Sequence, residues 1–337
     1  MKSLQIALIG CGHWGPNYVR LIQSLPDCQL KICVDLNADR LEALKKNYPQ
    51  LNCSQSSQDI FHDPSIEAVI IATPASTHFQ LVKQALLAGK HVLCEKPLTL
   101  DAQESDELHH LALERDLNLM VGHTFLFNSG IRQLKHYVQT GLLGQLYYIH
   151  ATRTNLGPIR QDANAVADLA SHDISIFNYL LESLPETVSA QGQSWLQPDV
   201  EDLAFMSLFY PGNILAHAHV SWLNPVKVRQ ITLVGSKKMV VWDDLNVSEP
   251  IRIYDVGVIQ EPYYQDFGQF QLLPRQGDTT IPRIRLQEPL KQEVEAFIGA
   301  IRESQALESD AAFAAGVVQV LNAVQSSLRQ RGLPVKL

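Results

Sequence analysis

The stretch that organises the start of the chain runs from Leu4 to Gly15 and reads LQIALIGCGHWG. Its apolar part predicts a buried strand over Leu4–Ile9, and the glycine-rich turn after it leads into a predicted helix. An acidic residue, Asp35, follows twenty positions after Gly15, at the end of the next apolar run. Glycines alone would indicate an ordinary turn. Strand, glycine turn, helix and acid in this order predict a dinucleotide-binding unit.

Each glycine has an expected task in such a turn. Gly10 permits the tight turn, Gly12 lets a pyrophosphate approach the backbone, and Gly15 lets the helix pack on the strand. The helix N-terminus offers free amides and a positive dipole end to phosphates. Asp35 would accept hydrogen bonds from ribose hydroxyls and repel a 2′-phosphate, which predicts NAD as the cofactor. Arg40, one turn into the next helix, leaves some tolerance of NADP open.

The first 120 residues alternate short apolar runs with helical patterns. Strands are expected at Leu4–Ile9, Leu30–Val34, Ala68–Ala72, His91–Cys94 and Asn118–Val121, and helices at Trp14–Ser24, Ala38–Tyr48, His78–Ala88 and Ala102–Arg115. Strands that are apolar on both faces and separated by helices predict a parallel sheet covered on both sides. We therefore expect a doubly wound α/β domain over residues 1–122, with Asn37 capping its second helix.

The pattern changes over residues 123–337. Helices are expected near Gly130–Gln139 and Ala167–Leu181, and strands at Gln145–Arg153, Val188–Trp195, Leu203–Phe209, Ile214–Trp222, Val228–Val234 and Met239–Trp242. Successive strands with short turns predict a large, mostly antiparallel sheet in an α+β domain for substrate binding and oligomerisation. Residues 257–289 are expected to be irregular. Helices at Pro289–Glu303 and Ser309–Arg329 close the chain, and we leave open that they pack back on the first domain.

Composition narrows the classes of function. The formal net charge is −8 and no long basic cluster occurs, which argues against a nucleic-acid partner. The five cysteines lie within the first 94 residues without metal-ligand spacing, so we expect free thiols and no metal site. No apolar run approaches the length of a membrane span. The apolar run at the start of the chain is shorter than the apolar region of a signal peptide. A cytoplasmic location is expected.

Three further motifs carry a resemblance to a known family. They are ATPASTH at residues 72–78, CEKPL at residues 94–98 and DLASH at residues 168–172. Together with the glycine turn they resemble the glucose–fructose oxidoreductase, inositol 2-dehydrogenase and rhizopine-catabolism (Gfo/Idh/MocA) family over essentially the whole chain. The resemblance implies that the EKP tripeptide closes the fifth strand of the nucleotide domain. It also implies that the DxxxH motif lies in the second domain.

The predicted reacting centre consists of Lys96, Asp168 and His172. An ammonium at a strand end can stabilise alkoxide character on the reacting oxygen. Asp168 and His172 are four positions apart, so on a helix they share a face. Imidazole suits removal of the hydroxyl proton, and a nearby carboxylate can orient it. Sequence leaves open whether Lys96 or His172 takes the proton, and Asp173 and His123 remain alternatives.

The other predicted site residues follow from the resemblance and from loop position. The residues expected to contact NAD are Gly10, Gly12, His13, Trp14, Gly15, Asp35, Thr73, Pro74, His78, Glu95 and Lys96. Arginines interleaved with asparagines before the DxxxH helix suit a polyhydroxylated ligand that bears phosphate or carboxylate. The residues expected to contact substrate are Lys96, Asn128, Arg153, Asn155, Arg160, Asn164 and His172.

These features predict an NAD-dependent dehydrogenase that oxidises a ring hydroxyl of a sugar or nucleotide sugar. The loop resembles that of UDP-N-acetylhexosamine 3-dehydrogenases, and inositol or another cyclitol is the nearest alternative substrate. An NAD-dependent glycoside hydrolase and a non-catalytic NAD-binding sensor also stay open. A large apolar sheet face would be exposed on a monomer, so a homodimer or homotetramer through the second domain's sheet is expected.

Overall fold

The computed structural model describes residues 3–157, 159, 163–260 and 272–337. The chain forms two compact units, and each contains two separate stretches of sequence. The first unit comprises Met1–Thr124 and Glu288–Gln319, and the second comprises Phe125–Gln287 and Val320–Leu337. The long C-terminal helix α9 (Ala311–Arg329) therefore contributes to both units.

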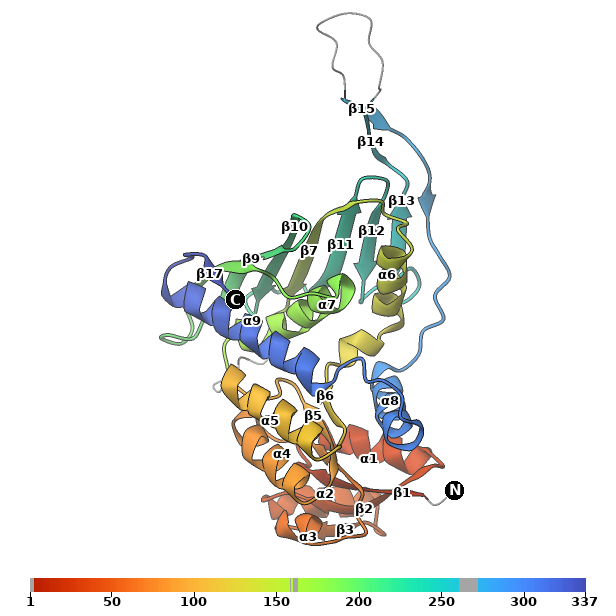
Figure 1. Ribbon diagram of the computed structural model, residues 1–337, viewed down its shortest axis with the longest axis vertical. Helices are drawn as coiled ribbons and strands as arrows, with labels where there is room; N and C mark the ends of the chain where they lie inside the picture. Colours follow the sequence, from red (N-terminus) through yellow and green to blue (C-terminus); the bar gives the residue numbers. More distant parts are fainter. Residues whose placement is uncertain (1–2, 158, 160–162, 261–271) are drawn as a thin grey trace, which may run out of the picture. The chain divides into compact units, whose positions relative to one another are not determined.

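The first unit is built on a six-stranded parallel sheet in the order β3-β2-β1-β4-β5-β6. Its elements from β1 to α5 are drawn in red to orange in Figure 1. This is the strand order of a Rossmann fold, which confirms the predicted fold class. The strands are β1 (Leu4–Ile9), β2 (Cys28–Val34), β3 (Asn52–Ser54), β4 (Ala68–Ile71), β5 (His91–Glu95) and β6 (Leu119–Gly122). The helices are α1 (Gly15–Ser24), α2 (Ala38–Asn47), α3 (Gln58–Phe61), α4 (His78–Leu87), α5 (Ala102–Glu114) and α8 (Pro289–Glu303), with a 3₁₀ turn η1 (Ala75–Thr77).

The central strands of this sheet are buried on both faces because helices cover both sides. All four residues of β4 are buried, and so are four of the five residues of β5. Asn37 caps α2 as expected, since its side chain accepts from the backbone amides of Asp39 and Arg40. The short elements β3 and α3 were not predicted, because three or four residues are too few to show a period.

The second unit contains a nine-stranded sheet in the order β16-β13-β12-β11-β7-β10-β9-β8-β17. All of its pairs are antiparallel except β10 with β7, which confirms the expected, mostly antiparallel sheet. Its strands are β7 (Leu146–Thr154), β8 (Thr187–Gln193), β9 (Leu203–Tyr210), β10 (Ile214–Ser221), β11 (Val228–Gly235), β12 (Met239–Asp243), β13 (Ile251–Tyr254), β16 (Thr279–Thr280) and β17 (Val335–Lys336). A separate hairpin pairs β14 (Gly257–Gln260) with β15 (Leu272–Arg275).

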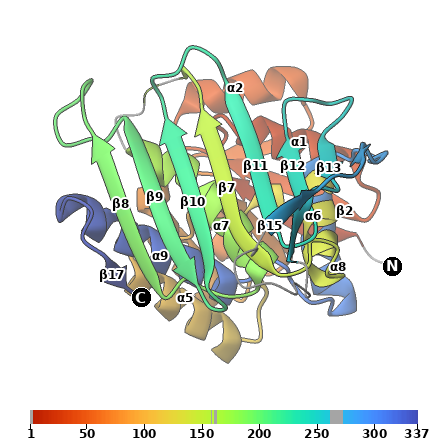
Figure 2. The same cartoon turned by 90° about the horizontal axis from the view of Figure 1, so that it is seen from above.

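The two faces of this sheet differ in composition. One face packs against α6 (Ser129–Gln139), α7 (Ser171–Leu181) and the second half of α9, and its side chains, such as Ile149, Leu233 and Trp242, are buried. Figure 2 looks onto the opposite face. That face carries exposed aromatic and aliphatic side chains, including Tyr148, Phe205, Phe209 and Leu215.

Two helical features bear on the sequence expectations. The expected helix Ala167–Leu181 begins as a π-helical turn, η3 (Val166–Ala170), before α7 starts at Ser171. A π-helical turn is rare and is frequently found at functional sites. Helix α9 is long and apolar enough by composition to cross a membrane, although 56% of its most apolar window is buried inside the fold. Gln319, Asn322 and Gln325 interrupt its apolar residues, so α9 is not the continuous apolar run of membrane-spanning length whose absence was expected.

Candidate functional site

The glycine turn after β1 fits the tasks predicted for its three glycines. Gly10 has a φ of +98°, and a Cβ there would lie 2.5 Å from the carbonyl oxygen of Ala72. A Cβ on Gly15 would lie 2.4 Å from the carbonyl oxygen of Gly10, so α1 approaches the turn too closely for any side chain. Beside Gly12 the nearest atom would be Nη1 of Arg40 at 3.7 Å. The turn is thus closed on two sides and open at Gly12, where a pyrophosphate is expected.

Asp35 lies at the end of β2 with its carboxylate turned back on the glycine turn. Oδ2 accepts from the backbone amide of Cys11 at 2.7 Å, and Oδ1 accepts from the amide of Asn37 at 2.8 Å. The guanidinium of Arg40 lies 3.5 Å from the same carboxylate and is half exposed. The structure therefore places Asp35 beside the turn that it was predicted to serve. Arg40, the residue that left NADP tolerance open, is its neighbour.

The loops after β4 and β5 are joined by His78. Its Nδ1 lies 2.8 Å from the carbonyl oxygen of Pro97, and its Nε2 lies 2.9 Å from that of Thr73. Burial lowers the pKa of His78 below its ordinary value, against a raising effect of these carbonyls. His78 is thus a buried link between two loops rather than an exposed group. His13, Trp14 and Pro74 are exposed, and Thr73 is half-buried.

Two buried carboxyl groups share one tyrosine behind the EKP motif. The hydroxyl of Tyr18 lies 2.9 Å from Oε1 of Glu95 and 3.3 Å from Oε1 of Glu293. One hydroxyl carries one proton, so it can donate to one carboxylate at a time. Burial, followed by the charge of Glu95, raises the pKa of Glu293 well above its ordinary value. Burial likewise raises the pKa of Glu95.

Lys96 follows β5 directly, as the EKP motif predicts, and is half-buried. The peptide bond between Lys96 and Pro97 is cis. Buried His123 follows the neighbouring strand β6, and neither of its ring nitrogens has a hydrogen-bond partner among the described residues. Burial first, and then the charge of Lys96, lower the pKa of His123 to about 3. An imidazole with so low a pKa is a weak base at neutral pH.

In the second unit, Asp168 and His172 lie on successive turns. Asp168 belongs to the π-helical turn η3 and His172 to the first turn of α7. Oδ2 of Asp168 accepts a hydrogen bond from the indole nitrogen of buried Trp222 at 3.2 Å. The amide oxygen of Asn164 caps the start of this segment by accepting from the amide of Ala167. Asp168 is therefore not the capping residue, and both it and His172 stay partly exposed.

The ring of Phe125 lies at the centre of the groups around His172. The imidazole of His172 meets it edge to face with 4.9 Å between ring centroids. The guanidinium carbons of Arg153 and Arg229 lie 4.5 Å and 5.1 Å from the centre of the same ring. Two cation–π contacts and edge-to-face contacts with His172 and Trp242 thus fix the position of Phe125.

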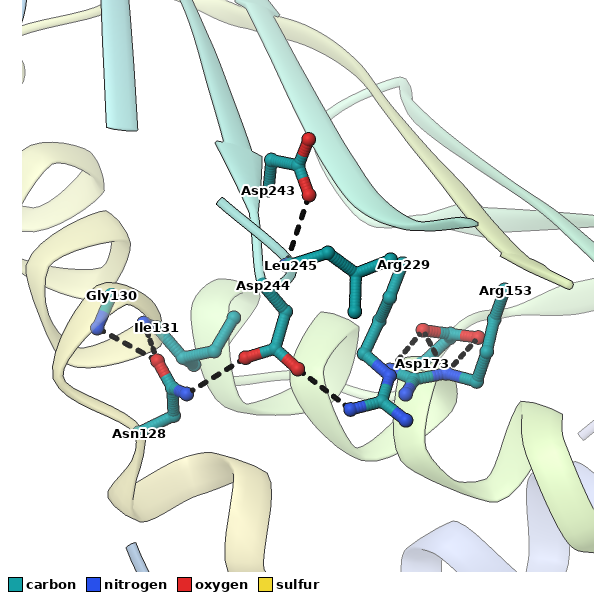
Figure 3. Close-up of polar contacts among 9 residues, drawn as sticks. All are labelled: Asn128, Gly130, Ile131, Arg153, Asp173, Arg229, Asp243, Asp244 and Leu245. Carbon is teal, nitrogen blue, oxygen red and sulfur yellow. Dashed lines mark hydrogen bonds and ion pairs between the residues drawn. The ribbon is translucent and has the colours of Figure 1, made fainter. Parts of the chain in front are cut away.

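Each of these arginines has an aspartate partner (Figure 3). Nε of Arg153 lies 3.0 Å from both carboxylate oxygens of Asp173, and Nη2 lies 2.8 Å from Oδ1. The side chains are 3% and 2% exposed. Nη1 of Arg229 donates to Asp244 at 2.6 Å, and Asp244 accepts from Nδ2 of Asn128 at 3.1 Å. Removing one partner of a buried pair such as Arg153–Asp173 typically costs about 3–5 kcal/mol.

The predicted substrate residues have varied surroundings in the second unit. The guanidinium of Arg153 is buried against Asp173, and Asn128 caps α6 by accepting from the amides of Gly130 and Ile131. Nδ2 of Asn164 donates to Glu201 and to Gln325. Asn155 is half-buried after β7, and Arg160 lies outside the described residues. Lys96 belongs to the first unit, so within the second unit the predicted catalytic residues are Asp168 and His172.

Comparison with known proteins identifies the family. Residues 4–123 match the family model described as "Oxidoreductase family, NAD-binding Rossmann fold", and residues 131–241 match the "GFO/IDH/MocA C-terminal domain". The chain belongs to the Gfo/Idh/MocA family of oxidoreductases. Its first unit is accordingly an NAD-binding Rossmann fold, and the glycine turn and Asp35 are the residues suited to hold that cofactor.

Individual relatives match different shares of the chain. UDP-N-acetylglucosamine 3-dehydrogenase from Acidithiobacillus ferrooxidans is 27% identical over 98% of this chain and 100% of its own length. A solved structure of that enzyme has a TM-score of 0.83, with 25% identity, and covers 98% of this chain and 99% of the other. Myo-inositol 2-dehydrogenase from Thermotoga maritima is 26% identical over 58% of this chain and spans 60% of its own length. Several curated relatives are thus matched over about 60% of their length.

Several residues of these sites were not found from the sequence. They are Tyr18 and Glu293 behind the EKP motif, and Phe125, Trp222, Arg229 and Asp244 around His172. Each lies far along the chain from the residue that it contacts, and no local motif marks it. Arg153 did carry a signal: it alternates with Ile149 and Ala151, which face the core. Among the described residues no cluster of three metal-ligating side chains occurs.

Proposed function

We propose that this protein oxidises a ring hydroxyl of a nucleotide-linked sugar, with reversible hydride transfer to NAD. The observation that carries this proposal is the full-length similarity to a UDP-N-acetylglucosamine 3-dehydrogenase, which extends over both units. The NAD-binding first unit and the DxxxH motif on η3 and α7 support it. When the carbon that bears the hydroxyl gives its hydride to NAD, the hydroxyl must give its proton to a base.

In this proposal His172 accepts the hydroxyl proton and Lys96 donates a hydrogen bond to the oxygen that becomes the carbonyl. Bound NAD supplies the acceptor for the hydride. Asp168, held by the indole of Trp222, orients His172 and favours its charged form after proton transfer. The two alternatives to His172 are less suited to the task. His123 has a pKa lowered to about 3 by burial, and Asp173 is paired with Arg153 in the core.

The proposed contacts to NAD and substrate change the sequence prediction at His78, Glu95 and Arg153. Gly12, Asp35, Thr73, Pro74 and the start of α1 face the cofactor, whereas buried His78 and Glu95 hold the loops behind it. On the substrate side, Asn155 and Asn164 remain candidates for direct contact. Arg153 is given a positioning role, because its guanidinium is buried against Asp173 and stacked on Phe125.

A cyclitol dehydrogenase is the second candidate. Inositol 2-dehydrogenases are among the similar proteins, and scyllo-inositol 2-dehydrogenase (NAD⁺) from Bacillus subtilis is 29% identical over 59% of this chain. Cyclitols and sugars present the same ring hydroxyls, so the residues proposed for catalysis would serve both. The two candidate substrates differ in the group attached to the ring. The nucleotide-linked sugar carries a nucleotide there, and the cyclitol does not.

We also propose that a second copy of the chain covers the open face of the nine-stranded sheet, as a dimer or tetramer. The apolar side chains on this face are 37–47% exposed, at Tyr148, Phe205, Phe209 and Leu215. Stacked rings continue the same face, where Phe205 and His219 lie 4.4 Å apart between centroids. Exposed apolar side chains that adjoin one another in this way mark protein–protein contact surfaces. The five free thiols suit the reducing cytoplasm, which we propose as the location.

The test is a substrate screen of purified protein with NAD. NADH formation is measured with UDP-N-acetylhexosamines, free N-acetylhexosamines, sugar phosphates and inositols. The proposal expects NADH with the UDP-sugars at the highest kcat/KM. NADH with inositols alone would transfer the assignment to the second candidate. Cleavage of a glycoside without net NADH, or NAD binding with no turnover of any compound, would contradict both.

A further inference from the structure

A basic hollow lies on the second unit, and none of the residues that line it has been assigned a role so far. It is open, measures about 340 Å³, and is lined by the first turn of α6 and by an extended segment near the end of the unit. The polar side chains in its wall are those of Ser129, Arg132, Gln133, Arg283, Arg285 and Gln287. Three guanidinium groups thus meet in one hollow of a chain whose formal net charge is −8.

The two walls of the hollow are joined by hydrogen bonding. The backbone amide of Gln287 donates to Oγ of Ser129 at 3.1 Å, which ties the extended segment to the start of α6. The guanidinium carbon of Arg132 lies 5.1 Å from the ring centre of buried Phe127. The cap residue Asn128 fixes the start of the helix through the amides of Gly130 and Ile131. The hollow is therefore a formed feature of the unit.

No carboxylate side chain lies among the residues that line the hollow. Arg283 and Arg285 form no ion pair with any residue that the structure describes. The first turn of α6 contains no acidic residue, and Arg132 stands where the helix dipole is positive. Arg283 and Arg285 therefore bring two positive charges to the start of α6 that no carboxylate of the described residues neutralises, and such charges attract an anion.

We propose that this hollow binds phosphoryl groups, and specifically the diphosphate of a nucleotide-linked substrate. Guanidinium groups bind phosphate oxygens through paired N–H donors, and the helix start and the two glutamine amides add further donors. The identity of the substrate in this inference rests on the proposed function. The affinity for phosphoryl groups rests on the hollow alone.

The hollow is connected to His172 through a series of contacts within the same unit. Asn128 at the start of α6 donates to Asp244, Asp244 pairs with Arg229, and Arg229 lies on the ring of Phe125. The same ring contacts His172. Arg153, which the sequence suggested as an anion-binding residue, is committed to Asp173. Arg283 and Arg285 therefore take over the role that the sequence had assigned to Arg153.

The first experiment measures binding of inorganic pyrophosphate by calorimetry at saturating NAD, which occupies the glycine turn. The test variant is Arg283→Gln/Arg285→Gln. The control variant is Arg252→Gln, because Arg252 lies in the same unit and forms an ion pair with Glu249. We expect the dissociation constant for pyrophosphate to rise about tenfold or more in the double variant alone. Affinity for NAD and the thermal unfolding midpoint should stay unchanged in both variants.

The second experiment separates a substrate diphosphate from free phosphate. With UDP-N-acetylglucosamine, the double variant should raise KM about tenfold or more and leave kcat nearly unchanged. Loss of pyrophosphate binding with an unchanged KM would overturn the diphosphate assignment in favour of free phosphate. Pyrophosphate that does not bind, or binds the double variant as tightly as the wild type, would overturn the site. Failure of every sugar to yield NADH would refute the proposed function and leave the pyrophosphate result standing.

Discussion

The indole nitrogen of Trp222 donates a hydrogen bond to Oδ2 of Asp168 over 3.2 Å, on the π-helical turn that precedes His172. Trp222 is buried and follows strand β10 directly, so the sheet fixes the position of the carboxylate. The backbone geometry of the π-helical turn determines where the side chain of Asp168 lies relative to that of His172. The orientation of the proposed base therefore depends on a residue fifty-four positions away in the sequence.

Replacing Trp222 by Phe tests this dependence. The change keeps most of the buried apolar volume and removes the donor, so we expect kcat to fall roughly ten- to a hundredfold. The KM for NAD should not change, because the glycine turn is untouched. Trp195→Phe, at an exposed position before β9, is the control. Unchanged kcat in Trp222→Phe would show that Asp168 needs no such support.

Cofactor preference is predicted from Asp35. We expect NAD to bind at least about tenfold more tightly than NADP, because the carboxylate pairs with ribose hydroxyls and opposes a phosphate. Asp35→Asn should narrow this gap, since it removes the negative charge and leaves Arg40 beside the turn. Dissociation constants from titration of each cofactor measure it. Equal values for NAD and NADP in the wild type would refute the role of Asp35.

The fold was largely predictable because its signals are local. Apolar runs of five or six residues, the glycine turn and the switch from alternating helices to successive strands all lie within short windows of sequence. The π-helical turn was not predictable, since the apolar spacing around Asp168 suits an α-helix as well. Strands β13 and β16, with four and two residues, show no period and depend on pairing with each other and with β12.

The stability of the first unit should depend on pH through Glu293. Its ordinary pKa is about 4.5, and burial and the charge of Glu95 raise its pKa well above this in the folded chain. Above pH 4.5 the unfolded chain releases this proton while the folded chain keeps it. The free energy of unfolding therefore decreases as pH rises, until the pKa in the folded state is passed. Glu293→Gln mimics the protonated form and should flatten this decrease.

Urea unfolding at a series of pH values above 4.5 measures the effect. Glu295→Gln is the matched control, because Glu295 lies on the same helix and pairs with Lys291 at the surface. The control should follow the wild-type curve. If Glu293→Gln also follows it, the carboxyl is ionised in the folded chain and the burial argument is wrong.

Assembly through the open face of the sheet predicts a mass of two or four times 37.7 kDa by light scattering at micromolar concentration. Phe205→Glu/Phe209→Glu places charges on β9 among the exposed apolar side chains of that face and should give a monomer. Val247→Glu, at an exposed position outside the face, should leave the assembly intact. A monomeric wild type would refute the proposed interface.

The site was predictable only where motifs carry it. The glycine turn, EKP and DxxxH each place candidate site residues within a few positions of one another, and the structure places Asp35 beside the turn that contains the three glycines. The side chains around His172 belong to β7, to β11 and to the residues after β6 and β12. These segments are far apart in the sequence and meet only when the second unit folds. Charge composition was misleading in one respect. Arg153 was expected to contact substrate but is buried in β7, whereas Arg283 and Arg285 line an open hollow.

The measurement that bears most directly on the proposed mechanism is a double-mutant cycle on Lys96 and His172. His172→Ala should lower kcat roughly 10²–10⁴-fold and remove the limb of the pH profile that reports the base. Lys96→Ala should cost a comparable factor through lost stabilisation of the reacting oxygen. Asp168→Asn should be milder. Affinity for NAD should change little in all of them.

If Lys96 and His172 act together in the same catalytic step, the double variant should be scarcely slower than either single variant. Effects of residues that act together in catalysis are strongly non-additive. Single-turnover formation of NADH with the best sugar substrate gives the four rates of the cycle. We predict a double variant within about threefold of the slower single variant. Additive losses, or near-wild-type turnover in either single variant, would contradict the assignment of these two residues.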